Sequence, residues 1–312
     1  MNTLDVVMVG PRSVGKTSLL AGMYREMRGE VDKLDCTLWQ DAPTAGFLNE
    51  RRHELEELAT GEGKVVTGEV GIKNNADSRA FTFGFVLNGD KRPTLSLCFT
   101  DLPGGWYGGS GNYQEADALL AKAAFSLIAV DATALMEERG KSGPGRYNNQ
   151  INQPDVIHQC YLRSKESLKE NKHRALFVLI RAESYVDPQE KKLMFTLLRE
   201  AYADLIADFN KHGIKAAATA VETVGGLRFH SFNTTNGSAT GKFVRKKGHK
   251  YAPKDCEVPF RWVLHIAAER ALANKKGGFF GWMRNIFGGN KKLESVVLTL
   301  TERSGQNIEM LT

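Results

Sequence analysis

The feature that most constrains this chain is the sequence GPRSVGKTS at Gly10–Ser18, which fits the pattern G-x-x-x-x-G-K-[ST]. The apolar run Leu4–Val9 precedes it and is typical of a buried parallel strand. The residues that follow, Thr17–Met27, place apolar side chains at helical spacing. A strand, a glycine-bearing loop and a helix in this order are the setting in which the pattern forms a phosphate-binding loop, or P-loop.

Each residue type in this loop has a physical role in holding phosphate. Glycine at positions 10 and 15 lets the backbone turn tightly and approach the ligand, and the backbone N–H groups of residues 13–17 point inward at the positive end of the helix. Lys16 supplies a cation for the β- and γ-phosphates, and the hydroxyl of Thr17 is a ligand for Mg²⁺. We expect the nucleotide to be bound in this loop by Gly10, Ser13, Val14, Gly15, Lys16, Thr17 and Ser18.

A second sequence, Asp101-Leu102-Pro103-Gly104, follows the apolar strand Leu95–Phe99 and fits D-x-x-G. An aspartate at such a strand end beside the P-loop can hold Mg²⁺ through water, and Gly104 can donate its backbone N–H to the γ-phosphate. D-x-x-G by itself is a common pattern, also found in ordinary turns. At a strand end that follows a P-loop, it supports a site for a nucleoside triphosphate with Mg²⁺.

Together, GPRSVGKTS and DLPG resemble the motifs of GTPases of the Ras-like, translation-factor-related class, and most closely bacterial double-GTPase-type and small-GTPase-like proteins. The resemblance covers the chain from residue 1 to about residue 235. It implies GTP and Mg²⁺ as cofactors, a catalytic centre containing Lys16 and Gly104, and loops that the γ-phosphate orders and hydrolysis releases. The expected output is nucleotide-dependent binding of a protein effector or a second GTPase.

Base recognition departs from the pattern of this class. Where these GTPases carry [NT]-K-x-D after a later strand, this chain has Ile180-Arg181-Ala182-Glu183. Arg181 can stack on the base, and Glu183 can accept the N1 and N2 hydrogens of guanine, although its side chain is one methylene longer than aspartate. These GTPases also carry a base-binding loop after the next strand, and this chain has two candidates for it, Val221–Val224 and Ser231–Asn233. Guanine is favoured over adenine, without being secured.

Two catalytic positions also depart from the pattern. The threonine that senses Mg²⁺ and γ-phosphate is assigned first to Thr67 and second to Thr44. The glutamine that often follows D-x-x-G to orient the attacking water is replaced by Gly105. We therefore expect slow hydrolysis, or hydrolysis completed by a partner or by another residue. Arg12 and Arg146 can supply positive charge, although a solvent-exposed role is the more usual one for each.

The pattern of elements predicts one α/β domain, with a mostly parallel sheet and helices on both faces. The domain is expected to span residues 1–273, with inserts near 30–78 and 232–256, and a C-terminal appendage occupies 274–312. Residues 61–75 and 139–154 are expected to be loops, and Asp131 is expected to cap the turn after its strand. The predicted strands are Leu4–Val9, Ala80–Leu87, Thr94–Thr100, Phe125–Val130, Ala175–Ile180 and Ala216–Val221, and a continuation of the last through Leu227–Phe232 is left open. The predicted helices are Thr17–Met27, Phe47–Leu58, Glu115–Ala124, Pro154–Asn171, Lys191–Lys211 and Glu257–Ala273.

Charge and aromatic residues gather near the end of the chain. The net charge of +6 is concentrated in Lys242–Lys250 and in Lys275–Lys292, a Gly/aromatic/Lys segment that contains Phe279, Phe280 and Trp282. Such a segment can pack on its own domain, dock on a partner or insert at a lipid interface. We therefore keep peripheral membrane contact open and expect no nucleic acid as a partner.

Composition indicates an ordinary globular protein, with 42% hydrophobic and 25% charged residues. No apolar run is long enough to cross a bilayer, the N-terminus has no basic signal region, and the four cysteines form no CxxC pair. A cytoplasmic location is expected, and the oligomeric state is open. Two other functions remain: an ATP-dependent P-loop enzyme, and a pseudo-GTPase scaffold that binds nucleotide without turnover.

Overall fold

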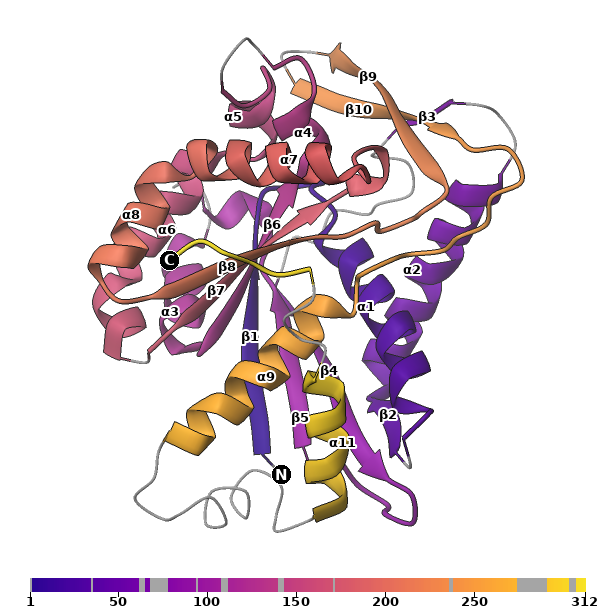
Figure 1. Cartoon of the computed structure of the whole chain (residues 1–312), viewed down its shortest axis with the longest axis vertical. Coiled ribbons are helices and arrows are strands. Elements are labelled where there is room, and N and C mark those ends of the chain that lie inside the picture. The colour runs from indigo at the N-terminus through magenta and orange to yellow at the C-terminus, as the bar shows by residue number, and fades with distance from the viewer. Residues whose placement is uncertain are drawn as a thin grey trace.

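The structure is a computed structural model that describes residues 2–34, 36–61, 65–67, 78–93, 95–107, 112–139, 143–170, 172–235, 238–273, 291–302 and 307–312. Its main feature is an eight-stranded sheet in the order β11-β8-β7-β6-β1-β5-β4-β2 (Figure 1). Strands β5, β1, β6, β7 and β8 are parallel, whereas β4, β2 and β11 each pair antiparallel with a neighbour. The predicted mostly parallel α/β fold is therefore confirmed. The strands of this sheet are β1 (Asn2–Val9), β2 (Cys36–Gln40), β4 (Arg79–Leu87), β5 (Leu95–Asp101), β6 (Phe125–Asp131), β7 (Arg174–Ile180), β8 (Lys215–Ala220) and β11 (Glu309–Met310).

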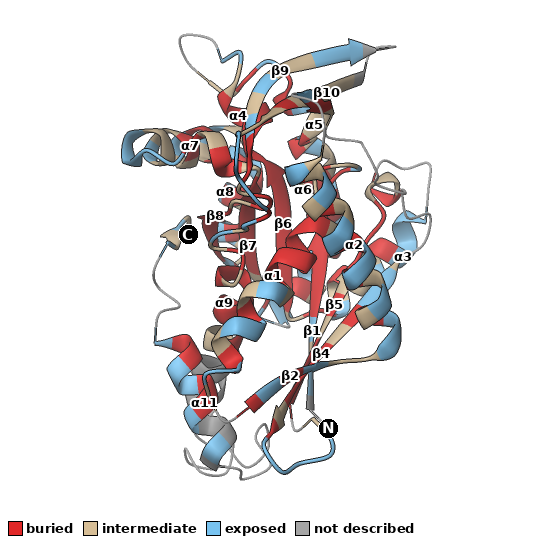
Figure 2. Ribbon diagram, turned by 90° about the vertical axis from the view of Figure 1, so that its right-hand side faces the viewer, coloured by how far each residue is buried: buried red, intermediate tan, exposed pale blue. Residues whose placement is uncertain are grey.

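Helices cover both faces of this sheet and enclose two hydrophobic cores. One core joins the sheet to α1, α2, α9 and α11, and the other joins it to α3, α4, α6, α7 and α8. In Figure 2 the central strands β1, β6 and β7 are buried between these layers. The helices are α1 (Lys16–Val31), α2 (Ala42–Thr60), α3 (Tyr113–Lys122), α4 (Ala132–Met136), α5 (Asn148–Ile151), α6 (Pro154–Glu170), α7 (Pro188–Ala201), α8 (Ala203–Lys211), α9 (Val258–Ala273) and α11 (Lys291–Thr301), with short 3-10 turns η1 (Gly104–Trp106) and η2 (Ala182–Ser184).

A second, three-stranded sheet joins the two predicted inserts. Strand β3 (Val65–Thr67) pairs antiparallel with β10 (Ser238–Arg245), and β10 pairs with β9 (Leu227–Thr235). The loop prediction for 61–75 is therefore wrong at β3, and β9 is a separate strand rather than a continuation of β8. Strand β3 has only three residues and its partner lies far along the chain, so no local pattern marks it.

Two further predictions differ from the structure. The single helix predicted over Lys191–Lys211 is two helices, because the backbone leaves helical geometry at Tyr202 (φ −116°). The Tyr202 side chain is buried there, and its hydroxyl donates to the carbonyl of Asn152 (3.3 Å). The predicted loop 139–154 contains the short helix α5, whose Asn148 side chain accepts a hydrogen bond from Asn152 (2.9 Å).

The C-terminal residues also contribute to the main body. Helix α11 packs on α9 and buries Val296, Val297 and Leu300, and β11 extends the main sheet from β8. Residues 274–290, with Phe279, Phe280 and Trp282, lie outside the described residues. Among the described helices, none has the length and apolar character needed to cross a membrane.

A partly buried carboxyl group at the junction of α1 and α9 is expected to make stability depend on pH. Glu26 accepts a hydrogen bond from the backbone N–H of Cys256 (2.6 Å). Burial, and next the carboxylate of Glu257, raise the pKa of Glu26 to about 8 from an ordinary value of 4.5. The folded chain thus keeps a proton that the unfolded chain releases, so the free energy of unfolding should fall as pH rises from 4.5 towards 8.

Glu26→Gln should remove this dependence, because glutamine keeps the acceptor oxygen and carries no charge. At pH 9 the variant should exceed wild type by on the order of 2 kcal/mol in free energy of unfolding, with little difference at pH 4. Urea denaturation at several pH values measures this. The exposed Glu50 of α2 supplies the control, Glu50→Gln, which should leave the profile unchanged. A Glu26→Gln profile parallel to wild type would contradict the prediction.

Candidate functional site

The P-loop lies at the carboxyl end of β1, where α1 begins. Gly15 has φ 110°, a left-handed conformation that favours glycine, and it directly precedes α1. The Lys16 side chain is 7% exposed and folds back over the loop. Its Nζ donates to the carbonyls of Gly10 (2.8 Å) and Pro11 (3.2 Å). The lysine therefore fixes the loop as well as bringing a positive charge to it.

Asp101 lies beside the P-loop, because β5 pairs with β1 in a register that places Asp101 opposite Met8. The Thr17 hydroxyl donates to Asp101 Oδ2 (3.0 Å), and Lys16 Nζ lies 3.7 Å from Asp101 Oδ1. Burial raises the pKa of Asp101 and lowers the pKa of Lys16, while the attraction between the two groups opposes both shifts.

This oxygen set fits a hard divalent cation. Asp101 Oδ1 is buried, and no described residue forms a hydrogen bond with it. The other carboxylate oxygen, Oδ2, accepts the hydrogen bond from the Thr17 hydroxyl, so a carboxylate and a hydroxyl lie side by side at the start of α1. Carboxylate, hydroxyl and water oxygens are the ligands that Mg²⁺ prefers. Thr17 and Asp101 are thus the residues that would hold the ion.

Gly104 packs directly against the P-loop. A Cβ atom at this position would overlap the backbone nitrogen of Arg12 and the carbonyl carbon of Pro11. Only glycine allows the D-x-x-G turn to approach this closely. The turn and the P-loop therefore form one surface, as the sequence predicted.

Arg181 joins the predicted base-recognition segment to the P-loop. It follows β7 with a left-handed backbone (φ 64°), and its guanidinium donates to Asp131 Oδ2 (2.5 Å) and to the carbonyl of Ser13 (2.9 Å). The planar fork of arginine holds both acceptors at once. Asp131 also caps α4 through the backbone N–H groups of Thr133 and Ala134, which confirms its predicted capping role.

The ion pair with Arg181 was not predicted for Asp131. The two residues follow neighbouring parallel strands, with Asp131 opposite Ile180 in the register of β6 and β7. The sequence signal that could have revealed this ion pair is the position of Asp131 and Arg181 at the carboxyl ends of adjacent strands.

Glu183 lies in η2 and is 6% exposed. Its Oε1 accepts hydrogen bonds from the N–H groups of Val224 (2.8 Å) and Gly225 (3.3 Å) and from the Thr223 hydroxyl (3.4 Å). Burial raises its pKa, and the two backbone donors partly offset that rise. Glu183 therefore anchors the loop after β8 and presents its carboxyl group inside the protein.

The loop after β8 corresponds to the first candidate base loop, Val221–Val224. The second candidate, Ser231–Asn233, lies within β9 of the smaller sheet. Only the first of the two contributes to the pocket beside Glu183.

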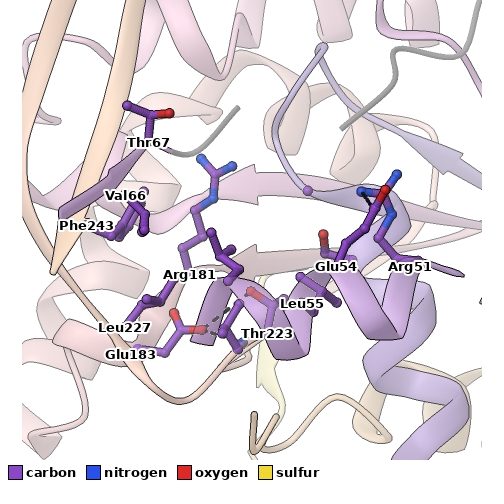
Figure 3. Close-up of a pocket in the computed structure, with 14 residues that line it drawn as sticks. Arg51, Glu54, Leu55, Val66, Thr67, Arg181, Glu183, Thr223, Leu227 and Phe243 are labelled. Carbon is purple, nitrogen blue, oxygen red and sulfur yellow. Dashed lines mark hydrogen bonds and ion pairs between the residues drawn. The ribbon is translucent and has the colours of Figure 1, made fainter. Parts of the chain in front are cut away.

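A pocket extends from the P-loop to this segment (Figure 3). Its cavity volume is about 40 Å³, and with the adjoining space that is open to solvent it spans about 600 Å³. Figure 3 shows Arg181 near its middle, with Glu183 and Thr223 to one side of it. The lining residues are Gly15, Ser18, Arg51, Glu54, Leu55, Leu58, Val66, Thr67, Arg181, Glu183, Thr223, Val224, Leu227 and Phe243.

The two candidate switch threonines have different surroundings. Thr67 lies in β3 and lines the pocket. Thr44 is buried near the start of α2, where its hydroxyl accepts a hydrogen bond from the backbone N–H of Thr82 (3.2 Å). That contact ties α2 to β4, whereas Thr67 belongs to the same cavity as the P-loop. The role in sensing γ-phosphate stays a prediction for Thr67.

Two charged residues of the pocket were missed in the sequence, besides five apolar ones. Arg51 on α2 is buried and forms an ion pair with Glu54 (2.5 Å), and both line the cavity. They lie in the first insert, where the sequence offers no motif. Their spacing of three positions on a helix was the sole signal.

Sequence comparison decides the family. The model of the Double-GTPase 2 family matches residues 6–227, which is more than half of the chain. The chain belongs to the Double-GTPase 2 family. The match contains the P-loop, Asp101, Arg181, Glu183 and the loop after β8. A GTPase-type domain makes GTP the expected ligand of this Double-GTPase 2 protein, and the resemblance noted in the sequence is confirmed.

Among curated proteins, no sequence matches this chain significantly. Similar solved structures include the GTPase-like domain of Ski7 from S. cerevisiae, bound to GTP, with 15% identity over 70% of this chain and 43% of that chain and a TM-score of 0.38. The bacterial dynamin GTPase LeoA from ETEC has 13% sequence identity, covering 97% of this chain and 38% of that chain, with a TM-score of 0.35. Sup35 in complex with GDP has 11% sequence identity, covering 71% of this chain and 37% of that chain, with a TM-score of 0.34. This chain thus spans 37% to 43% of those chains, and such distant likeness says nothing about function.

Proposed function

We propose that this chain binds GTP with Mg²⁺, hydrolyses it slowly or with the help of a partner, and uses the bound nucleotide to control binding of another protein. A protein effector and a second GTPase are the two kinds of partner that fit such a switch. Peripheral membrane contact through Phe279, Phe280 and Trp282 remains a separate proposal, which liposome sedimentation of a chain lacking residues 275–292 would test.

The observation that carries this proposal is that a phosphate cradle, the D-x-x-G turn and a pocket adjoin one another in a single site. Lys16 and Thr17 form a cradle with Asp101, the D-x-x-G turn abuts it, and Arg181 ties it to a pocket with Glu183 on its wall. The cradle suits the phosphates and Mg²⁺. The adjoining pocket is placed to receive the base.

Guanine is the base that this pocket fits best. The Glu183 carboxylate can accept both the N1 and N2 hydrogens of guanine, whereas adenine has no N1 hydrogen. The aliphatic stem of Arg181 lies between η2 and Ser13, where it can lie against a ring face. The Glu183 carboxyl group is buried on the pocket wall, so a base that offers it no hydrogens should bind less tightly than guanine.

Glu183→Ala should therefore reduce the preference for GTP over ATP by about tenfold or more. Isothermal titration with non-hydrolysable GTP and ATP analogues in Mg²⁺ measures both affinities. Because Glu183 also anchors residues 223–225, the folded state of the variant is checked by thermal denaturation, and Glu222→Ala in the same loop is the comparison. Tighter binding of the ATP analogue by wild type would instead support the ATP-dependent enzyme.

The hydrolysis part is tested separately by single-turnover measurement. Gly105 stands where many GTPases place a water-orienting glutamine, which favours slow intrinsic turnover. The same observation favours a pseudo-GTPase scaffold as the second candidate. Tight GTP binding with no turnover, alone or with a partner, would decide for the scaffold.

A further inference from the structure

A cationic side chain occupies the space that Gly105 leaves open. A Cβ atom at residue 105 would lie 3.2 Å from Arg12 Nη2, 3.4 Å from Nε and 3.6 Å from Cζ. One edge of the Arg12 guanidinium therefore lies across the point where a side chain at position 105 would start. A side chain at position 105 would thus be in close contact with the Arg12 guanidinium beside the P-loop.

Arg12 is also available for a ligand. It is exposed, and no described residue forms a hydrogen bond or ion pair with it. Other arginines of interest are already paired: Arg181 with Asp131, Arg51 with Glu54 and Arg146 with Glu138 (3.9 Å). Arg146, the other candidate for a catalytic arginine, is thus paired with Glu138. Of the two arginines considered from sequence, the structure brings Arg12 to the D-x-x-G turn.

The backbone on both sides of Arg12 is held in place. The preceding carbonyl, of Pro11, accepts from Lys16, and the following carbonyl, of Ser13, accepts from Arg181. Gly104 packs against the backbone of Arg12 itself. The base of the side chain is thus held beside the D-x-x-G turn, so that bringing its charge to a ligand there would cost little backbone entropy.

We propose that Arg12 is the catalytic arginine of this chain, acting in cis from the P-loop in the place that Gly105 leaves open. The proposal rests on the proposed GTP hydrolysis. In that reaction a water oxygen bonds to the γ-phosphorus and the bond to the β–γ bridging oxygen breaks. The products are GDP and inorganic phosphate, and the proton of the water passes to phosphate or solvent. Negative charge grows on the bridging and γ-oxygens, and the Arg12 guanidinium stabilises it.

Single-turnover GTP hydrolysis by the full chain in Mg²⁺ tests this. Wild type should turn over on the order of 10⁻² s⁻¹, the scale of GTPases with an arginine in cis. Arg12→Ala should slow the step by about 100-fold, because one pre-positioned donor is worth roughly that factor. Arg12→Lys should recover only part of the rate, since lysine keeps the charge and loses the planar fork. Arg92→Ala, at an exposed arginine in the turn between β4 and β5, should match wild type.

Binding measurements separate catalysis from folding. Affinities of Arg12→Ala for GDP and for a non-hydrolysable GTP analogue should stay within about threefold of wild type, while binding of GDP with aluminium fluoride, a mimic of the transition state, should be lost. Equal turnover by wild type and Arg12→Ala would overturn the role of Arg12 and leave the GTPase intact. Wild type that binds GTP without turning it over would overturn both this role and hydrolysis, leaving nucleotide binding in place.

Discussion

Lys16→Met is expected to lower the affinity for a GTP analogue by at least about 100-fold and to destabilise the fold. The side chain supplies the cation for the β- and γ-phosphates, and it also holds the P-loop through Gly10 and Pro11. Asp101 is left without its buried counter-ion, and loss of one partner of a buried pair costs about 3–5 kcal/mol. Isothermal titration and urea denaturation measure the two effects.

The double variant Lys16→Met/Asp101→Asn separates these effects. Removing the stranded charge should return much of the lost free energy of unfolding, whereas nucleotide affinity should stay low. Lys33→Met, at an exposed lysine after α1, is the matched control for loss of a lysine. Near-normal GTP affinity in the single variant would remove the P-loop assignment of Lys16.

Phe260→Ala is expected to cost about 3–5 kcal/mol in free energy of unfolding. Phe260 on α9 is fully buried, with ring centroids 5.6 Å from Phe99, 5.9 Å from Phe83 and 6.0 Å from Phe85. Alanine would leave a cavity between α9 and the sheet. For a chain of this size the loss corresponds to a fall in Tm of about 10 °C.

Helix α9 lies beyond the residues that the family model matches. The stability of this variant therefore measures how much α9 contributes to the fold. Leu298→Ala on the neighbouring α11 is the control, because its side chain is 46% exposed and the change should be within about 0.5 kcal/mol. Thermal denaturation of both variants decides the point. A loss below about 1 kcal/mol for Phe260→Ala would show that α9 adds little to the core.

The parts of the fold that could be predicted are those encoded by short stretches of chain. Strand β1, the P-loop and α1 are contiguous, so periodicity and the glycine pattern were enough to place Lys16 and Thr17. Asp101 followed from a strand end in a parallel sheet, where ligands gather. The alternation of strands and helices then fixed the fold class.

The parts that could not be predicted depend on partners distant in sequence. Strand β3 exists because it pairs with β10, and Cys36–Gln40 is a strand because it pairs with β4. In the site, Arg181 was predicted to meet a base, but its contacts with Asp131 and Ser13 required the register of three chain segments. Arg51 entered the pocket through the packing of α2 against α1, which no local pattern reports.

The second sheet has a consequence for the order in which the chain acquires its binding site during synthesis. Residues up to Asp101 complete the phosphate cradle early, whereas the pocket wall that includes Val66 waits for Phe243 on β10 to emerge and pair with it. A nascent chain ending before β10 would contain Lys16, Thr17 and Asp101 without Phe243 of the pocket wall. On the proposed function, discrimination between nucleotides would thus depend on residues that leave the ribosome after those that bind phosphate.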